Sequence, residues 1–300
     1  MNTRMIINLT IAAALVSVLA SCAPSASNPS SQSFSSTDEA SNSNIIGGVS
    51  SSLSYEKQNG IVGLLRITQD SSGQQSTAIC TGSLIQKNIV VTAAHCITLQ
   101  PGQQLVGALI FFGTDLDAIM SEMDRRDLSH VRVIDKAIRH EAYLRGTGTN
   151  NDIALVRIKD AAPSDFQLAQ LAPASMARTL RKGSLVTLAG FGVSSYSVDP
   201  KTQQAQGSGE GLLRQIGGIS VLSITPAAQE ITLDQSKGSG ACHGDSGGPA
   251  YFADPVSKKT YVIGVTSRGV GSVLCDRQVI YTGIMGYSQW IADNSKKILM

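Results

Sequence analysis

The feature that most constrains the fold is a series of short apolar runs, rich in β-branched residues, that recur after residue 45. Turn-forming clusters such as Asp70–Gly73 and Pro101–Gly102 separate these runs. Runs of strand length with turns between them are typical of an all-β barrel or sandwich. The expected strands are Ile61–Ile67, Thr77–Ile85, Ile89–Thr92, Leu105–Phe112, Val131–Ile134, Ile153–Ile158, Leu185–Ala189, Leu212–Ile224, Tyr261–Thr266 and Val279–Thr282.

The composition excludes several classes of protein. The chain has 300 residues, of which 42% are apolar and 15% are charged, so it can bury a sizeable core and is not disordered along its whole length. Its 24 basic and 22 acidic residues give a net charge of +2, and no basic block stands out. We therefore expect no nucleic-acid partner.

The end of the chain has a different pattern. Within residues 286–299, the apolar side chains of Trp290, Ile291 and Ile298 stand among polar ones. Apolar residues at this spacing indicate an amphipathic helix. We expect a C-terminal helix here that packs one face onto the body of the protein.

The first 21 residues are typical of a secretion signal. A short basic segment with Arg4 precedes the apolar run Met5–Ala20, which spans roughly 24 Å as a helix. A bilayer core is about 30 Å thick, so this run is short for a permanent membrane span. We expect the protein to be exported.

The apolar run ends at Leu19-Ala20-Ser21-Cys22, which resembles the lipobox of bacterial lipoproteins. In that motif the Cys receives the lipid, so Cys22 is the expected lipidation site. The alternative is an ordinary signal peptide that happens to contain a Cys. We expect a bacterial protein that is secreted or associated with the cell envelope, and whose contact with a membrane is through a lipid on Cys22.

Residues 22–44 are rich in Ser and Asn and contain one aromatic residue. Such a segment cannot build a core, so it predicts a flexible linker or propeptide. The folded domain is expected to occupy residues 45–300, and a Gln/Gly/Ser-rich stretch over 201–211 predicts a long surface loop within it.

Two segments carry candidate chemistry. One is Val91–Cys96, which contains His95 after a β-branched run, and the other is Cys242–Pro249, which contains Ser246. A Ser hydroxyl needs a base to become a nucleophile at neutral pH, and the His imidazole has a suitable pKa. The base in turn needs an orienting carboxylate, for which Asp152, at the start of an apolar strand, is the candidate.

The glycines around Ser246 favour a tight turn. Gly244 and Gly247 allow the backbone to aim N–H groups at one point. Such donors can hold a developing oxyanion, and one donor typically contributes about 2.7–4 kcal/mol to catalysis. The pattern therefore predicts nucleophilic catalysis by Ser246.

Together these segments resemble the chymotrypsin/trypsin family of serine peptidases over nearly all of residues 45–293, with His, Asp and Ser in the family's order. The matching segments are Ile45–Gly48, Cys80–Ser83, Thr92–Cys96, Asp152–Leu155, Gly190–Gly192, Gly244–Pro249, Tyr281–Thr282 and Trp290–Ile291. The resemblance implies an all-β fold of two six-stranded antiparallel β-barrels, with the active site in the cleft between them and a helix at the C-terminus. The barrels would occupy about 45–160 and about 161–285.

The resemblance also implies roles for individual residues. Ser246 is the expected nucleophile, His95 the general base and then acid, and Asp152 the group that fixes the His tautomer. The backbone N–H groups of Gly244 and Ser246 form the expected oxyanion hole. Ser267 matches the Ser that supports the Asp and borders the substrate backbone.

Activation follows from the same resemblance. In the family, cleavage before the Ile-X-Gly-Gly motif frees an ammonium group that pairs with the Asp preceding the catalytic Ser. Here these groups are Ile45 and Asp245. Residue 44 is Asn, so a trypsin-like activating protease is not expected.

If Cys22 carries a lipid, four Cys remain, and export makes disulfides plausible. Four Cys allow three pairings. On the evidence of the family's motifs, we expect Cys80–Cys96 and Cys242–Cys275.

A zinc site is the rival interpretation of the Cys residues, because His95 and His243 each adjoin one. No CxxC occurs, and neither spacing matches a known ligand set. Acidic residues over 115–124 lie where some relatives bind calcium, but they are better interpreted as a solvated acidic turn. We expect no metal and no cofactor.

The resemblance places the primary substrate pocket around Gly240, Gly269 and Val279, beside Ser267. Gly240 aligns with the base of the pocket, where trypsin-like members carry Asp, so no carboxylate would pair with a substrate Lys or Arg. Val279 would shorten the pocket. We expect small to medium apolar side chains before the scissile bond.

Arg268 and Phe191 depart from the family's pattern. Arg268 stands where many members have an aromatic residue in the substrate cleft, and Phe191 stands where the family usually has Trp, a tolerable packing change. The prediction is a secreted, monomeric serine endopeptidase acting on polypeptides. The alternatives are a catalytically inactive homologue that serves as a binding module and a purely structural surface lipoprotein.

Overall fold

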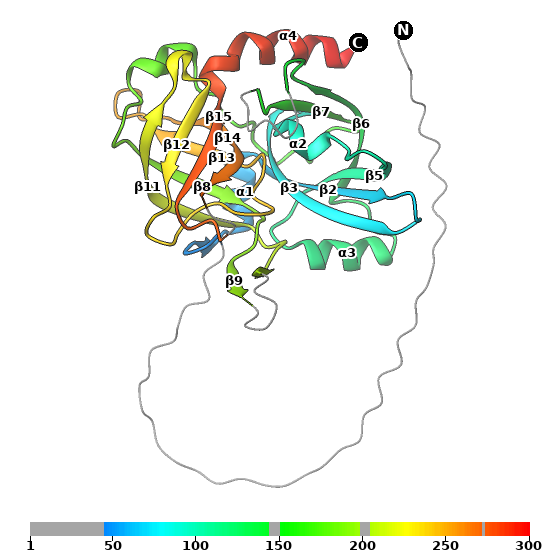
Figure 1. Cartoon of the computed structure of the whole chain (residues 1–300). Coiled ribbons are helices and arrows are strands. Elements are labelled where there is room, and N and C mark those ends of the chain that lie inside the picture. Colours follow the sequence, from blue (N-terminus) through cyan, green and yellow to red (C-terminus); the bar gives the residue numbers. More distant parts are fainter. Residues whose placement is uncertain (1–44, 144–150, 199–204, 272–273) are drawn as a thin grey trace, which may run out of the picture. The chain divides into compact units, whose positions relative to one another are not determined.

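In this computed structural model, residues 45–143, 151–198, 205–271 and 274–300 are described. The expected signal peptide and linker over residues 1–44, with Cys22, lie outside this range. The described chain forms two antiparallel barrels that lie side by side (Figure 1). None of its helices combines the length and the apolar character needed to cross a membrane.

The first barrel is closed by six strands in the spatial order β2-β3-β4-β7-β6-β5. Neighbouring strands in this barrel are antiparallel. Its strands are β2 (Ile61–Gln69), β3 (Gln75–Gln86), β4 (Ile89–Thr92), β5 (Gln104–Phe111), β6 (Val131–Arg139) and β7 (Ala154–Ile158).

Strand β6 shows why the expected lengths differ from the observed ones. The apolar run stops at Ile134, but the strand continues to Arg139. Asp135 and Arg139 point to solvent while Ile138 is partly buried, as expected for the two-residue period of a strand. Polar residues on the outer face therefore hid the second half of the strand.

The second barrel has the spatial order β8-β11-β12-β15-β14-β13, and it closes because β8 pairs with both β11 and β13. Its strands are β8 (Leu185–Gly190), β11 (Arg214–Ile224), β12 (Glu230–Asp234), β13 (Pro249–Ala253), β14 (Thr260–Val270) and β15 (Gln278–Gly283). The expected fold of two six-stranded barrels is confirmed.

Strands β12 and β13 were missing from the sequence-based expectation. β12 has an acidic residue at each end, and β13 begins with Pro249, so neither reads as an apolar run. A two-residue strand, β1 (Val49–Ser50), pairs with β11. The first residues of the domain therefore join the second barrel before the chain enters the first one.

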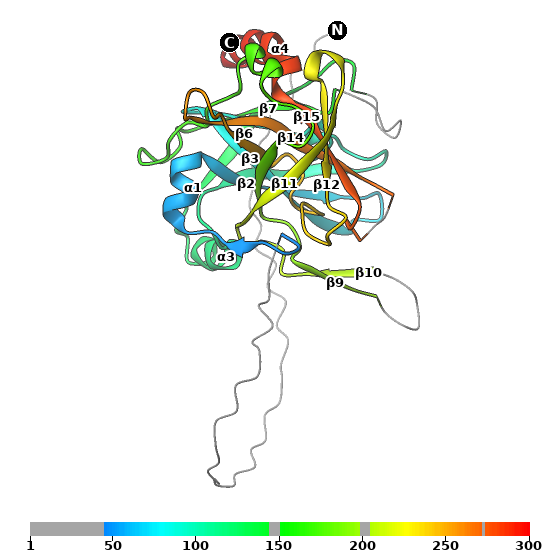
Figure 2. The ribbon, with the colours of Figure 1, turned by 90° about the vertical axis from the view of Figure 1, so that its left-hand side faces the viewer.

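Residues 201–204 of the expected surface loop over 201–211 lie outside the described residues, and the expectation is wrong for the part that forms a strand. β9 (Ser195–Val198) and β10 (Ala205–Ser208) pair as an antiparallel hairpin that projects from the second barrel (Figure 2). The side chains of Ser194 and Ser195 both reach Ser208, through its carbonyl and its hydroxyl respectively. These contacts fasten the base of the hairpin.

Four α-helices and three short 3₁₀ helices occur in the described residues. They are α1 (Leu53–Asn59), α2 (Ala94–Ile97), α3 (Leu116–Asp124), α4 (Ser288–Leu299), η1 (Ala174–Arg178), η2 (Pro226–Ala228) and η3 (Ile284–Tyr287). The C-terminal helix was expected, and it packs on the first barrel, where Arg157 of β7 donates to the carbonyl of Ile298.

Helix α3 corrects the interpretation of the acidic residues over 115–124 as a turn. Asp115 caps the helix by accepting hydrogen bonds from the N–H groups of Asp117 and Ala118. Leu116 and Ile119 are buried on its inner face. The acidic residues therefore serve an N-cap and the outer face of a helix.

Aromatic packing joins the two barrels. Phe111, at the end of β5, and Phe191, just after β8, are fully buried and meet edge to face with centroids 4.8 Å apart. A Cβ at Gly63 would collide with the Phe111 ring, so β2 needs glycine at this point. Phe191, which stands where the family usually has Trp, is thus packed in the core against Phe111.

Helix α1 contains a buried acid, Glu56. Its side chain is fully buried, and Oε1 accepts a hydrogen bond of 2.7 Å from Gly113 N. Burial raises the pKa of this carboxyl to about 8, and the Gly113 hydrogen bond offsets part of that effect. Oε2 has no hydrogen-bond partner among the described residues.

Glu56→Gln should reduce the pH dependence of stability. The folded-state pKa lies above the unfolded one, so the stability that Glu56 contributes is complete below about pH 4.5 and is lost as the pH rises through about 8. Gln keeps an acceptor but cannot ionise. The free energy of unfolding should therefore fall less in the variant than in the parent chain between about pH 5 and about pH 8. The two decreases should differ by on the order of a few kcal/mol.

Urea unfolding at both pH values measures this difference. Glu141→Gln is the matched control, because Glu141 is exposed and has a lowered pKa, so it titrates below this range. The same pH dependence in Glu56→Gln and the parent chain would contradict the prediction.

Candidate active site

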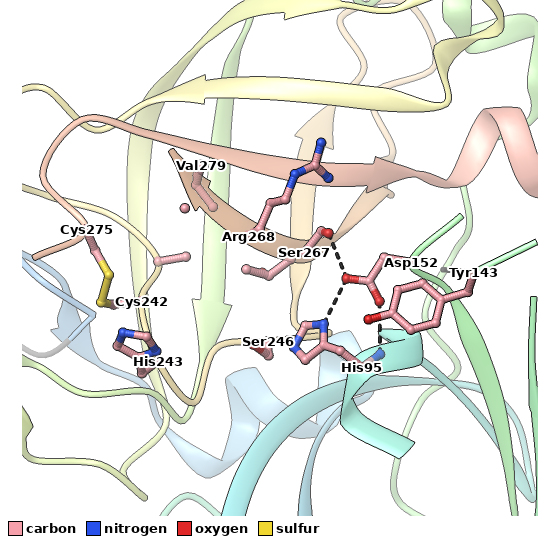
Figure 3. A pocket seen from close by; sticks show the side chains of 13 residues that line it. His95, Tyr143, Asp152, Cys242, His243, Ser246, Ser267, Arg268, Cys275 and Val279 are labelled. Atoms are coloured by element: carbon pink, nitrogen blue, oxygen red, sulfur yellow. Dashed lines mark hydrogen bonds and ion pairs between the residues drawn. A yellow bond between two sulfur atoms is a disulfide. The ribbon is translucent and has the colours of Figure 1, made fainter. Parts of the chain in front are cut away.

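A cavity of about 390 Å³ lies between the two barrels (Figure 3). His95, Tyr143 and Asp152 line it from the first barrel. The second barrel contributes the rest of the lining, which consists of Ala241, Cys242, His243, Ser246, Thr266, Ser267, Arg268, Gly269, Cys275 and Val279. The three residues expected to form the triad therefore meet in one cavity.

His95 and Asp152 are joined by two hydrogen bonds. His95 Nδ1 lies 2.8 Å from Asp152 Oδ2, and His95 N donates to Asp152 Oδ1 at 3.0 Å. A carboxylate can only accept, so the Nδ1 of the ring carries the proton in this contact. The other ring nitrogen, Nε2, is then left as the acceptor in a neutral imidazole.

Two strands of the second barrel hold the Asp152 residue of the first. Ser267 Oγ of β14 donates to Asp152 Oδ2 at 2.7 Å, and Thr282 Oγ1 of β15 donates to the Asp152 carbonyl at 3.0 Å. Burial raises the pKa of Asp152, but the hydrogen bonds from His95 and Ser267 outweigh it, so the net pKa is below its usual value. Asp152 is therefore ionised at neutral pH.

Tyr287 clamps the residue that precedes Asp152. Asn151 adopts a left-handed backbone conformation with φ of 73°, which Asn tolerates better than most residues. Its N–H donates to the Tyr287 hydroxyl, and that hydroxyl donates to Asn151 Oδ1, both at 3.0 Å. Sequence reasoning missed Tyr287, since nothing in its local pattern points to a residue 136 positions away.

The turn that carries Ser246 is held by β3 of the first barrel. Thr81 N donates to the Ser246 carbonyl at 2.8 Å, and Thr81 Oγ1 donates to the Gly244 carbonyl at 3.0 Å. Gly244 and Gly247 have φ of 93° and 78°, conformations that favour glycine. A Cβ at Gly247 would also collide with Thr92 Oγ1.

Two backbone N–H groups of this turn remain available. Within the described residues, Gly244 N and Ser246 N donate to no protein acceptor, whereas Asp245 N is used by the Cys242 carbonyl. Among the described residues, His95 and Ser246 Oγ line the same cavity without a hydrogen bond between them. Contacts of this kind are often long in an empty site and shorten when substrate binds.

The family model described as Trypsin matches residues 58–291. The chain belongs to the trypsin family. It is 31% identical to the CLIP domain-containing serine protease B4 of Anopheles gambiae, over 81% of this chain and 65% of that protein. It is 28% identical to coagulation factor XII of Sus scrofa, over 72% of this chain and 36% of that protein. The chain thus spans less than two thirds of the length of these relatives.

A solved structure agrees with this assignment at the level of the fold. The structure of HL collagenase covers 84% of this chain and 98% of its own, with a TM-score of 0.61 and 22% sequence identity. The likeness at this identity concerns the double-barrel architecture alone.

Asp245 has a different environment from Asp152, although both acids are buried. Its carboxylate accepts hydrogen bonds from Gly192 N at 2.9 Å and from Cys242 N at 2.8 Å, and no ion pair reaches it within the described residues. Burial raises the pKa of Asp245 to about 7, against the lowering effect of these two bonds. A Cβ at Gly190 or Gly192 would collide with the carboxylate, which explains both glycines of that trypsin-family segment.

The expected pocket residues are only partly together. Ser267, Gly269 and Val279 line the cavity, but Gly240 does not. Gly240 is buried, and a Cβ there would collide with the side chain of Gln235.

Gln235 lies behind the pocket and was missed by sequence reasoning. Its Oε1 accepts from Ala241 N at 2.9 Å, and its Nε2 donates to the Ala241 carbonyl at 3.1 Å and the Cys275 carbonyl at 2.6 Å. Its amide is thereby satisfied by backbone groups. A neutral side chain, that of Gln235, therefore lies against Gly240, the residue that was expected at the base of the pocket.

Both expected disulfides are present. Cys80 is bonded to Cys96, and Cys242 is bonded to Cys275. His95 and His243 lie close to these sulfur atoms, but sulfurs in a disulfide are not thiolate ligands. The described Cys and His clusters are therefore explained by the disulfides.

Proposed function

We propose that this chain is a secreted serine endopeptidase that hydrolyses peptide bonds through an acyl-enzyme intermediate. The observation that carries the proposal is the His95–Asp152 pair in the same cavity as Ser246, next to the unused N–H groups of Gly244 and Ser246. All of these groups come from one chain, so a monomer suffices for the reaction.

The proposed mechanism gives each step to one of these groups. Because Asp152 holds the Nδ1 proton, Nε2 of His95 is the basic nitrogen that removes the Ser246 proton as Oγ attacks the substrate carbonyl carbon. The oxygen of that carbonyl gains negative charge and accepts hydrogen bonds from Gly244 N and Ser246 N. His95 then gives the proton to the leaving amine, and water repeats the sequence to release the acid.

Ser246→Ala should abolish peptide hydrolysis while the chain folds normally, because the hydroxyl supplies chemistry rather than packing. Loss of the nucleophile in a site of this type lowers kcat by about 10⁶. The measurement is kcat on a peptide amide, with the folded state checked by circular dichroism. Ser223→Ala, an exposed Ser on β11, is the control and should leave kcat unchanged.

Near parental activity in Ser246→Ala would show that another group performs the reaction. Absence of hydrolysis and of fluorophosphonate labelling in the parent chain that begins at Ile45 would instead favour the inactive binding module.

We propose that the primary pocket takes a small to medium apolar side chain. Val279 is buried in the wall of the cavity, and Ala241 and Gly269 are its small neighbours. The pocket side of the cavity carries no carboxylate among the described residues, and Gln235 behind it is neutral. A substrate Lys or Arg would therefore lose its hydration without gaining a partner.

Val279→Gly should deepen the pocket and shift the preference towards larger apolar residues. The ratio of kcat/KM for Phe over Ala before the scissile bond should rise by at least about tenfold, the usual effect of opening an apolar pocket. A library of peptide substrates measures the ratio in both chains. A parental profile dominated by Arg or Lys would refute the pocket assignment.

We also propose that cleavage before Ile45 activates the chain. The segment is already docked: Ile45 is fully buried, Ile46 pairs with Gly240, and Gly240 N donates to the Ile46 carbonyl. In the intact chain, the nitrogen of Ile45 is an uncharged amide. Cleavage would turn it into an ammonium group that can pair with the buried Asp245.

An ion pair at this point would stabilise the Gly244–Ser246 turn. Removing one partner of a buried pair typically costs about 3–5 kcal/mol. Asp245→Ala in the chain that begins at Ile45 should therefore lower kcat/KM by roughly 10²- to 10³-fold. Asp276→Ala is the control, because Asp276 is an exposed acid next to Cys275, which lines the cavity.

N-terminal sequencing of the active form and fractionation of the cells test the activation site. The active form should begin at Ile45. An active form still joined to residues 23–44, or full activity of Asp245→Ala, would contradict the activation proposal.

We propose residues 1–21 as the signal peptide, residues 22–44 as the propeptide and Cys22 as the lipidation site. The serine protease of Anopheles gambiae and the coagulation factor of Sus scrofa are animal proteins, whereas the lipobox-like end of the apolar run resembles a feature of bacterial lipoproteins. The four Cys of the folded part are used in two internal disulfides, so no disulfide would tether the propeptide to it. Cleavage before Ile45 would then activate the peptidase and release it from the membrane together.

A further inference from the structure

The second half of β14 borders the cavity. β14 pairs with β13 only as far as Val265, but it pairs with β15 up to Val270. Arg268 and Gly269 therefore pair on one side only, with Ile280 and Val279 of β15, and Ser267 lies at a register shift just before them. All three residues line the cavity. An unpaired strand edge can receive an extended peptide as an added strand.

Arg268 is the charged side chain on this edge. Its Nη1 donates to Glu230 Oε1 at 2.9 Å, and its side chain remains 27% exposed. Glu230, at the start of β12, is only 11% exposed. Figure 3 shows Arg268 extending from the strand next to Ser267.

The guanidinium has donors beyond the one that Glu230 uses. Arg carries five N–H donors in a planar fork that matches a carboxylate. Among the described residues, the Glu230 contact is the one hydrogen bond assigned to the Arg268 side chain. The ion pair with Glu230 therefore holds the guanidinium in place, while its remaining N–H donors stay available at the cavity.

The strand register indicates which substrate residue lies across from Arg268. Gly247 N donates to the Thr266 carbonyl at 2.8 Å, so the Ser246 turn lies beside Thr266. In a peptide added to this edge with its scissile carbonyl at Ser246, the residue that carries this carbonyl would lie across from Ser267, with its side chain in the pocket near Gly269. The preceding residue would lie across from Arg268, and side chains of directly opposed residues share a face.

We infer that Arg268 forms a subsite for an acidic side chain at the second residue before the scissile bond. A substrate Asp or Glu would bind the guanidinium donors that Glu230 leaves open, and Glu230 would hold the side chain in place. The inference rests on the proposed peptidase function and adds a second specificity element to the apolar pocket.

The test uses the chain that begins at Ile45 and pairs of peptides that differ only in Glu or Gln at this position. The ratio of kcat/KM for Glu over Gln should be roughly three- to tenfold in the parent chain, in line with a partly exposed ion pair. Arg268→Gln should bring the ratio to about one, and Arg268→Lys should keep part of it. Arg277→Gln, which removes the same charge outside the cavity lining, should leave the ratio unchanged.

A second variant separates recognition from a structural role. Glu230→Gln removes the carboxylate that competes for Arg268, so the Glu/Gln ratio should rise above the parental value. If the pair only supported the fold, Arg268→Gln and Glu230→Gln would lower the rates on both peptides equally. The ratio should also shrink at about 1 M salt, where charge interactions at exposed groups are screened.

The outcomes distinguish the two proposals. A parental ratio of about one, with hydrolysis that depends on Ser246, would overturn the acidic subsite and leave the peptidase function standing. An unchanged ratio in Arg268→Gln would overturn it as well. Absence of hydrolysis of every peptide would overturn the proposed function, and the subsite with it.

Discussion

The buried carboxylate of Asp152 is the group on which the arrangement of the cavity depends. It belongs to the first barrel, but Ser267 of the second barrel donates to it, and Thr282 binds its carbonyl. Burying a charge is costly unless hydrogen bonds compensate it. Here the same bonds that compensate the charge also fix the ring of His95 and set the position of one barrel against the other.

The second buried acid, Asp245, shows the opposite balance. Asp152 receives hydrogen bonds from two side chains and a backbone N–H, and its pKa is lowered; Asp245 has two backbone donors, and burial raises its pKa to about 7. The difference follows from the groups around each carboxylate rather than from burial, which both share. A buried acid with an uncompensated charge is what a new ammonium group could stabilise, so the contrast supports Ile45 as the activation site.

The sequence predicted the strands that read as continuous apolar runs, and the structure confirms the two barrels. It did not predict β12 or β13, because Glu230, Asp234 and Pro249 interrupt the apolar pattern at their ends. It also missed α3, whose acidic residues mask a short buried face. The local sequence pattern indicates which structure a segment favours by itself. The structure of β12, β13 and α3 depends on the elements that they pair or pack with.

The candidate site likewise contains residues that the sequence predicted and residues that it did not. His95, Asp152 and Ser246 stand in recognisable motifs, so their meeting in one cavity was predictable. Tyr287 and Gln235 were not, since each acts through a contact between segments far apart in the chain. Their roles depend on the fold, and no spacing rule in a single sequence reveals them.

The links across the barrel interface explain why the cavity keeps its shape. Thr81 donates to the Ser246 and Gly244 carbonyls, and Phe191 N donates to Thr81 Oγ1. The disulfide at the neighbouring Cys80 ties this strand to Cys96, next to His95. The turn that carries Ser246 and the segment that carries His95 are thus attached to the same strand of the first barrel. Because a disulfide restricts the unfolded chain as well, it favours the state in which both are in place. The geometry of the site is therefore a property of the packed interface and not of any single loop.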